Sequence, residues 1–171
     1  QGVYSGPTIA IYWFFEHVEE GIIFEDDCLP HPSFFQFCQE MLTKYRDSEK
    51  IMHISGDNFQ FGTKRGDASY YFSIYPNSWG WATWRRAWKH FDPSLSTFPK
   101  FRDENKIAEI VPEKDEQKVW LDTFKKEYYG EWKTWDYEWV YTIWSRGGLS
   151  VIPNVNLISN IGFGENATHT F

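Results

Sequence analysis

Three consecutive acidic residues follow a short apolar segment near the start of the chain. Residues 21–24 are apolar, and Glu25, Asp26 and Asp27 come directly after them. An apolar run of this length beside turn residues predicts a buried strand of an α/β sheet. Ligands of open α/β sheets bind just beyond the carboxyl ends of the strands, where these carboxylates would lie. We therefore expect the three residues to share a cation or a hydrogen-bonded ligand, with an ordinary solvated turn as the alternative.

The chemistry that suits these side chains is divalent metal binding. Oxygen ligands are preferred by Mg²⁺ and Mn²⁺, which take few protein carboxylates and keep other positions for substrate phosphates. A second acidic group, Asp57, follows another strand candidate at residues 51–55. A third group, Asp136 and Glu138, stands between Trp135 and Trp139 at a predicted helix start. Either carboxylate could act there as a general base toward an incoming hydroxyl, with ordinary helix capping as the alternative.

Two further positions are weaker candidates. His169 lies in a glycine-rich tail and could contact a metal ion or a phosphate, although a single histidine is commonly without such a role. Gly80 stands between Trp79 and Trp81, where a glycine allows a close approach to a ligand or satisfies packing. The sequence has no Gly-x-Ser-x-Gly motif and no phosphate-binding glycine-rich loop. These absences argue against a serine hydrolase, a P-loop NTPase and a Rossmann dehydrogenase.

The elements that must position these residues follow from periodicity and turn signals. The alternation of helical and strand patterns favours an α/β fold with a sheet that is at least partly parallel. Residues 92–114 contain three prolines and mixed charges, so we expect a long surface excursion there. The patterns predict helices over 8–18, 33–45, 78–91, 115–129 and 135–146, and strands over 21–24, 51–55, 70–75 and 149–152.

Composition limits the class of protein. The 171 residues suffice for one domain with a substantial core, and the net charge of −7 without a basic stripe argues against a nucleic-acid partner. Aromatic residues make up 20% of the chain, with 10 Trp, and they could fill the core or form platforms for sugar rings. The presence of only two cysteines and the lack of a long apolar run predict a cytoplasmic location, and peripheral attachment to a membrane is compatible with this.

The ordered series of segments resembles the second half of a GT-A-fold, nucleotide-sugar-dependent glycosyltransferase. The acidic triplet after its strand resembles the DXD-type motif of that fold, and residues 32–37 resemble the helix that follows it. Residues 75–88, which include Trp-Gly-Trp and paired Arg, are similar to the acceptor-side segment of family 2 bacterial transferases, and residues 135–139 to the segment that supplies their base. The series is also similar to the eukaryotic N-acetylglucosaminyltransferases that initiate hybrid N-glycans. The resemblance covers roughly residues 10–170.

The resemblance implies a role for each matching residue. Asp27 would coordinate Mn²⁺ or Mg²⁺ on the donor diphosphate, while Glu25 and Asp26 would contact the ribose or the waters of the metal. Asp136 or Glu138 would be the catalytic base, and the sequence does not choose between them. Glu25 and His169 are further metal-ligand candidates, and the expected nucleotide-sugar site also includes Asp57, Gly80 and Trp81. A UDP-sugar is the expected donor, and the acceptor would be a glycan, a lipid or a protein.

The sequence thus predicts a single GT-A-like α/β domain over residues 1–171, with a mixed sheet and flanking helices. In this interpretation the chain is the C-terminal part of a larger catalytic domain and lacks its N-terminal strands. Its activity would be metal-dependent and, from the family 2 resemblance, inverting. A non-catalytic carbohydrate-binding or interaction domain is the main alternative, and a metal-dependent phosphohydrolase a weaker one. An unpaired sheet edge would also favour self-association.

Overall fold

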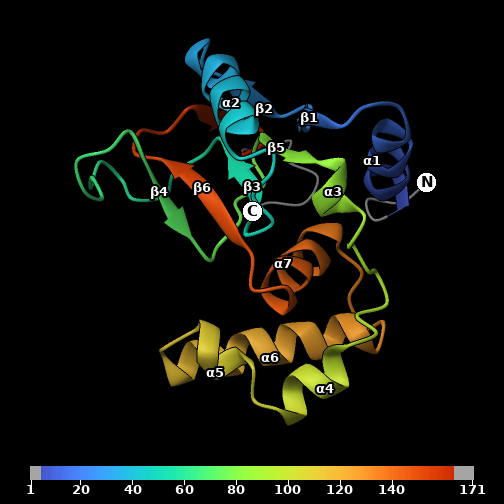
Figure 1. Ribbon diagram of the computed structural model, residues 1–171. Coiled ribbons are helices and arrows are strands. Elements are labelled where there is room, and N and C mark those ends of the chain that lie inside the picture. The colour runs from blue at the N-terminus through green and yellow to red at the C-terminus, as the bar shows by residue number, and fades with distance from the viewer. Residues whose placement is uncertain (1–4, 164–171) are drawn as a thin grey trace.

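The computed structural model describes residues 5–163, which form a mixed sheet with flanking helices (Figure 1). The five-stranded main sheet has the order β1-β5-β3-β6-β4, and β2 pairs with β7 in a small second sheet. The strands are β1 (Glu20–Ile23), β2 (Cys28–Pro30), β3 (Ile51–Ser55), β4 (Tyr70–Ser73), β5 (Trp81–Trp84), β6 (Leu149–Pro153) and β7 (Ile158–Asn160). The helices are α1 (Ser5–His17), α2 (Ser33–Lys44), α3 (Arg85–Trp88), α4 (Phe98–Asp103), α5 (Ile107–Ile110), α6 (Lys114–Tyr128) and α7 (Trp135–Ser145).

Strand direction brings several chain segments to one edge of the main sheet. Strands β3 and β6 are parallel, whereas β5 runs antiparallel to both β1 and β3. Ile23 at the end of β1 and Ser55 at the end of β3 both lie opposite Trp81, the first residue of β5. We call this the carboxyl edge, because β1, β3 and β6 all end there. The residues that follow β1 and β3 are therefore neighbours in space. A shared site for Glu25, Asp26, Asp27 and Asp57 requires this proximity.

The prediction of a helix over residues 78–91 is wrong in its first half. Residues 81–84 form strand β5, and only Arg85–Trp88 turn into the short helix α3. Trp81 and Trp84 fit a helical face by spacing, but all four residues of β5 are buried between β1 and β3. Pairing on both sides satisfies the backbone polar groups of this apolar segment. Residues 81–84 therefore form a strand although their local pattern is helical.

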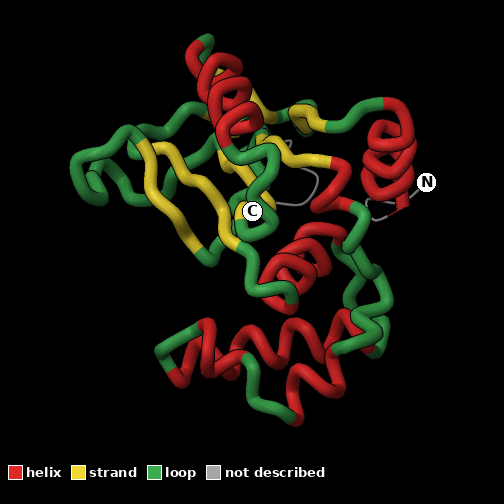
Figure 2. Tube along the Cα trace, viewed as in Figure 1, coloured by secondary structure: helices red, strands yellow, loops and turns green. Residues whose placement is uncertain are grey.

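Two other expectations need correction. Strand β1 is not a buried central strand: its residues are only partly buried, and β5 is its one partner within residues 5–163. Residues 92–114 are not merely a surface excursion, because they contain α4 and α5 with Phe98, Phe101 and Ile107 buried. Figure 2 shows these helices and α6 as a layer below the strands. We call α4, α5 and α6 the helical layer. Self-association through the β1 edge stays a prediction.

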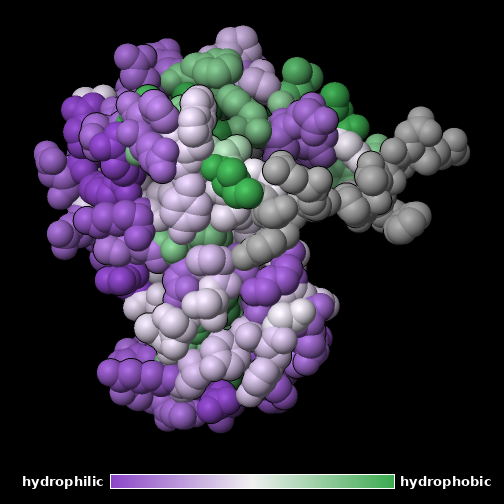
Figure 3. Space-filling model, turned by 90° about the vertical axis from the view of Figure 1, so that its right-hand side faces the viewer, coloured by the Kyte–Doolittle hydropathy of each residue, from purple (hydrophilic) through white to green (hydrophobic). Residues whose placement is uncertain are grey.

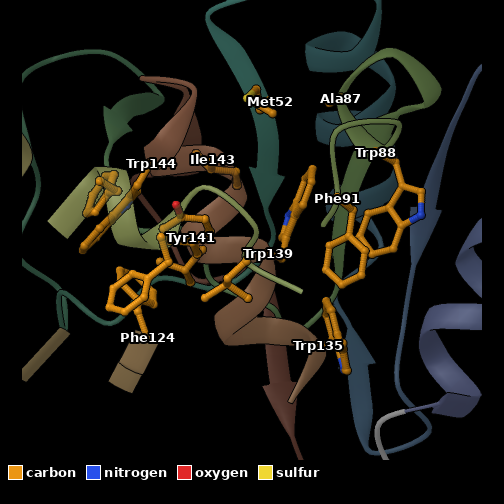
Figure 4. Packing of buried hydrophobic residues seen from close by; sticks show 14 of the residues in the cluster. Met52, Ala87, Trp88, Phe91, Phe124, Trp135, Trp139, Tyr141, Ile143 and Trp144 are labelled. Carbon is orange, nitrogen blue, oxygen red and sulfur yellow. The ribbon is translucent and has the colours of Figure 1, made fainter. Parts of the chain in front are cut away.

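Aromatic side chains fill the core on the α7 side of the sheet. Trp81 stacks between His53, at a ring-centroid distance of 5.1 Å, and Trp135, at 5.5 Å. The indole of Trp139 donates to His53 Nδ1 (3.1 Å), and His53 Nε2 donates to the carbonyl of Asn77 (2.8 Å). Burial lowers the pKa of His53 to about 4, so the imidazole is neutral. Figure 4 shows Trp135 and Trp139 within this cluster. Most of the tryptophans are thus structural.

The opposite face of the main sheet is covered by α2. Phe34, Cys38 and Leu42 of that helix belong to a second buried cluster with Ala82 and Trp84 of β5. Side chains alternate between faces along a strand, so β5 contributes Trp81 to one cluster and Trp84 to the other. Strand β5 therefore joins the two cores.

The described surface includes apolar positions but no membrane-spanning element. Within residues 5–163, no helix is both long and apolar enough to cross a bilayer. On the face in Figure 3, hydrophobic residues gather in the upper part, and the lower part is mainly hydrophilic or intermediate. Helix α1 leaves Ile9 and Trp13 exposed. Cys28 and Cys38 are buried free thiols. The cellular compartment stays a prediction.

The hydrogen bond between Trp139 and His53 provides a test of this core. Replacing Trp139 by Phe removes the donor to His53 Nδ1 and leaves a small cavity, so we expect a loss of about 2–4 kcal/mol in the free energy of unfolding. Urea denaturation followed by circular dichroism measures the change. Trp13→Phe, at a position that is 62% exposed, is the control and should change stability by less than about 0.5 kcal/mol. Equal stability of the two variants would contradict the role given to the pair.

Candidate functional site

The acidic triplet lies at the carboxyl edge, between the main sheet and the small sheet. Strand β1 ends at Ile23, and a turn closed by the Cys28 N–H on the Glu25 carbonyl (3.1 Å) leads into β2. The carbonyl of Asp27 accepts a hydrogen bond from the N–H of Ile161, just beyond β7 (2.8 Å). Glu25 and Asp26 are exposed and Asp27 is partly buried. Both sheets hold the turn, and its carboxylates remain accessible.

The N-terminus of α7 meets this turn. Trp135 stacks on Trp81, and Trp81 lies opposite Ile23 in the sheet, so the start of α7 is placed beside the end of β1. Desolvation raises the pKa of Glu25, and the negative charges of Asp27, Asp136 and Asp26 raise it further, while a hydrogen bond from Trp135 opposes them. Residues far apart in the sequence thus form one acidic cluster, which we define as Glu25, Asp26, Asp27 and Asp136.

The two candidate bases have different environments. Asp136 is partly exposed and contributes to the electrostatic field at Glu25. Glu138 is fully buried, and its Oε1 lies 3.4 Å from the ammonium group of Lys133. A base must reach the hydroxyl that it deprotonates. Of the two positions that the sequence left open, Asp136 is therefore the one in the acidic cluster with access to solvent.

Glu127 is a further acidic residue near the cluster, and the sequence analysis missed it. It comes from the last turn of α6, is fully buried, and accepts hydrogen bonds from the backbone N–H (3.2 Å) and hydroxyl (2.8 Å) of Thr134. Burial raises its pKa, and the charge of Asp136 adds to the shift. Thr134 is the N-cap residue of α7. Glu127 therefore fixes the start of α7, a role that no local pattern in the sequence could have indicated.

Asp57 lies at the carboxyl edge but not at its surface. Its side chain follows β3, is 1% exposed, and neither carboxylate oxygen meets a hydrogen-bond partner among the described residues. Burial raises the pKa of Asp57 to about 7. The carboxyl group is therefore not accessible from the surface. Its predicted role in nucleotide-sugar binding stays a prediction.

Gly80 and Trp81 both have structural reasons for their identity. Gly80 has a φ of +70°, and its carbonyl accepts a hydrogen bond from the Gly56 N–H (2.8 Å). A Cβ atom at position 80 would lie 2.8 Å from the side chain of Ile158 and 2.9 Å from Phe24. A larger residue would be strained by this backbone conformation and would have to displace the ends of both side chains. The ring of Trp81 is completely buried. Contacts of either residue with a sugar nucleotide stay predictions.

Gly162 lies against Asp27, and the residue after it belongs to a set of aromatic side chains. A Cβ atom at Gly162 would overlap Asp27 Oδ2, so the backbone of this glycine lies directly against the carboxylate. The next residue, Phe163, has its ring 5.3 Å from that of Trp79, which in turn contacts Phe59 at 4.9 Å. Phe59 and Phe163 are 43% and 53% exposed. We call Phe59, Trp79 and Phe163 the aromatic rim.

The donor set of the acidic cluster suits a hard divalent cation. Asp27 and Glu25 offer carboxylate oxygens. Burial raises the pKa of Glu25, repulsion from the neighbouring carboxylates raises it further, and a positive charge would relieve that repulsion. No three His, Cys, Asp or Glu side chains of residues 5–163 are arranged to hold a metal by themselves. Mg²⁺ commonly uses only one or two protein carboxylates together with substrate phosphates, so Asp27 and Glu25 would be enough protein ligands for this ion. The remaining candidate, His169, lies outside the described residues.

Comparison with known proteins gives no match: no protein-family model fits the chain, and no curated protein is significantly similar to it.

The buried carboxyl group of Asp57 predicts a particular pH dependence. Its pKa of about 7 in the folded chain exceeds the ordinary 3.8, so the folded chain keeps a proton that the unfolded chain loses. The contribution of Asp57 to stability is therefore complete below about pH 4 and falls as the pH rises toward 7. Asp57→Asn should remove this loss and raise the free energy of unfolding at pH 8 by up to about 4 kcal/mol.

Urea denaturation between pH 4 and pH 8 measures this effect as the difference between the variant and the unmodified chain. Asp115→Asn, at an exposed position of α6, is the matched control and should leave the pH profile unchanged. A difference that does not grow with pH would show that Asp57 ionises normally.

Proposed function

We propose that the chain is a GT-A-like glycosyltransferase domain that transfers a sugar from a nucleotide-diphosphate donor to an acceptor hydroxyl group. One observation carries the proposal: the acidic turn after β1 and the start of α7 present carboxylates to the same site. Sugar transfer needs a place for the donor diphosphate and a base at the acceptor, and the two parts of the acidic cluster can serve these needs. The mixed sheet with helices on its faces is compatible with this fold.

Asp27 and Glu25 would hold the divalent metal ion, with Asp26 beside them. When bound, Mg²⁺ or Mn²⁺ would neutralise negative charge on the departing nucleoside diphosphate. The backbone of Gly162 lies against Asp27 and keeps side-chain bulk away from the carboxylate. A UDP-sugar is the donor that the family resemblance favours.

Asp136 would act as the base. The acceptor oxygen attacks the anomeric carbon, the bond from that carbon to the diphosphate oxygen breaks, and the acceptor proton passes to the Asp136 carboxylate. Attack from the face opposite the leaving group inverts the anomeric configuration, as the resemblance to family 2 transferases implies. Glu127 holds Thr134 and with it the first turn of α7, so it positions Asp136 without touching substrate.

The donor site is tested by calorimetric titration of UDP into the 171-residue chain with and without Mn²⁺. Binding should require the metal, and Asp27→Ala should weaken it by at least about tenfold, because an anionic metal ligand is lost. Asp67→Ala, which removes an exposed aspartate from the 62–69 loop, is the matched control and should bind normally. Metal-dependent binding that survives Asp27→Ala would contradict the assigned ligand.

The base is tested by measuring UDP release from a panel of UDP-sugars in the presence of Mn²⁺. Asp136→Asn should lower kcat by about 10²–10⁴-fold while UDP binding persists, because the side chain keeps its shape and loses its basicity. Glu138→Gln should affect stability more than turnover, since that carboxylate is buried beside Lys133. The opposite pattern would assign the base to Glu138.

A non-catalytic carbohydrate-binding domain remains the second candidate, and the aromatic rim favours it. Exposed aromatic faces are suited to stacking against sugar rings, and Phe59, Trp79 and Phe163 form a continuous set of ring contacts. Such a domain would bind free glycan without metal or nucleotide. Glycan-array binding that is insensitive to EDTA and lost in Trp79→Ala would favour this function over the transferase.

A further inference from the structure

The loop between α6 and α7 carries an exposed tryptophan. Residues 129–134 join the two helices (Figure 1), and Trp132 among them is 43% exposed. Of the tryptophans, Trp13 is the other exposed one, and the rest are at least partly buried. The N–H groups of Glu131 and Trp132 both donate to the carbonyl of Lys126, at 2.9 Å and 3.3 Å. The end of α6 therefore sets the position of Trp132, although burial in the core does not explain this residue.

The indole of Trp132 is held in a defined orientation. It stacks on the ring of Tyr137 in the first turn of α7, with ring centroids 6.2 Å apart and an interplanar angle of 23°. The ammonium group of Lys126 lies 4.5 Å from the centroid of the same indole, and it pairs with Asp122 at 2.6 Å. An aromatic side chain that is already ordered and still exposed loses little further entropy when a ligand binds to it.

Tyr137 connects this indole to the acidic cluster. It directly follows Asp136, the proposed base, and its ring packs against Trp120 of α6 at a centroid distance of 6.0 Å. Burial raises the pKa of the Tyr137 phenol, and the charges of Asp136 and Glu127 raise it further. Trp132, Tyr137 and Asp136 therefore lie in one region at the start of α7. An acceptor that reaches Asp136 passes this region.

Charged side chains surround the exposed indole. Glu131 and Lys133 flank Trp132 in the sequence and are exposed, and the ion pair of Lys126 with Asp122 lies at the ring. A lipid chain needs a contiguous apolar surface. A sugar ring instead offers apolar C–H groups to an aromatic ring and hydroxyl groups to charged side chains. A single exposed indole among charged groups is therefore better suited to a sugar than to a lipid.

We propose that the acceptor is a glycan and that Trp132 forms its binding subsite. A sugar ring of the acceptor packs against the exposed part of the indole while the reacting hydroxyl group meets Asp136. This inference rests on the proposed function, because it takes Asp136 as the base, and it selects one of the three acceptor classes that the sequence left open. The subsite is distinct from the aromatic rim, which adjoins Asp27 through Gly162 and Phe163.

Glycan binding is tested by ¹⁹F NMR on the chain labelled with 5-fluorotryptophan, in the presence of UDP and Mn²⁺. Trp132→Phe identifies the signal of Trp132 among those of the 10 Trp. Chitotriose, cellotriose and maltotriose are the probes, and at least one should shift this signal saturably below about 10 mM. The signal of Trp13, which is 62% exposed on α1, should not move. Absence of a Trp132 shift with all three probes would overturn the proposal.

Transfer kinetics test the role of Trp132 as an acceptor subsite. With a UDP-sugar and the oligosaccharide that binds, Trp132→Ala should raise the acceptor KM by at least about tenfold and leave kcat within about twofold, because the lost contact does not involve the reacting atoms. Trp132→Tyr keeps a flat ring and should retain most of the affinity. Trp13→Ala is the matched control at an exposed tryptophan and should behave as the unmodified chain, and circular dichroism checks the folding of each variant.

The outcomes separate this inference from the proposed function. An unchanged acceptor KM in Trp132→Ala, or faster transfer to farnesyl phosphate than to any of the oligosaccharides, would overturn the glycan subsite while the transferase function stands. A saturable Trp132 shift in a chain that neither binds UDP with Mn²⁺ nor releases it from UDP-sugars would support the glycan site and contradict the transferase function.

Discussion

The stacking of Trp81 between His53 and Trp135 is the contact on which the arrangement of the candidate site depends. Trp81 begins β5, the strand that pairs with β1 and β3. Its ring then meets Trp135 at the first turn of α7. One side chain therefore joins the end of β1, the end of β3 and the start of α7. Large aromatic rings suit this position because they bury much area and have few rotamers, so the geometry that they define is well fixed.

This arrangement gathers like charges at one edge of the sheet, which costs stability. Burial raises the pKa values of Glu25, Asp57 and Glu127, and the acidic neighbours of Glu25 raise its pKa further. Titratable groups shifted by specific neighbours and by desolvation concentrate at functional sites, which is why the cluster supports a functional interpretation. Glu127 differs from the other two, because two hydrogen bonds to Thr134 give it a clear structural role.

The two edges of the main sheet differ in charge. The carboxyl edge carries accessible carboxylates beside aromatic side chains. At the opposite edge, Lys50 and Arg146 line a cavity together with residues of the helical layer. The net charge of −7 is therefore a poor description of either edge. A sheet with parallel strands separates its two ends in space, so the charges at one edge can differ from those at the other.

The sequence by itself determined the alternation of helices and strands, the limits of β3 and the acidic turn after β1, because hydrophobic periodicity and turn residues act locally. It could not assign β5, because Trp81 and Trp84 fit a helix or a buried strand equally well until β1 and β3 lie on either side. The short strands β2 and β7 pair with each other, so neither could be predicted from its own residues. Only the tertiary structure placed Asp136 beside Glu25 and buried Glu138 with Lys133, since burial and the distance between remote segments are set by packing of the whole domain.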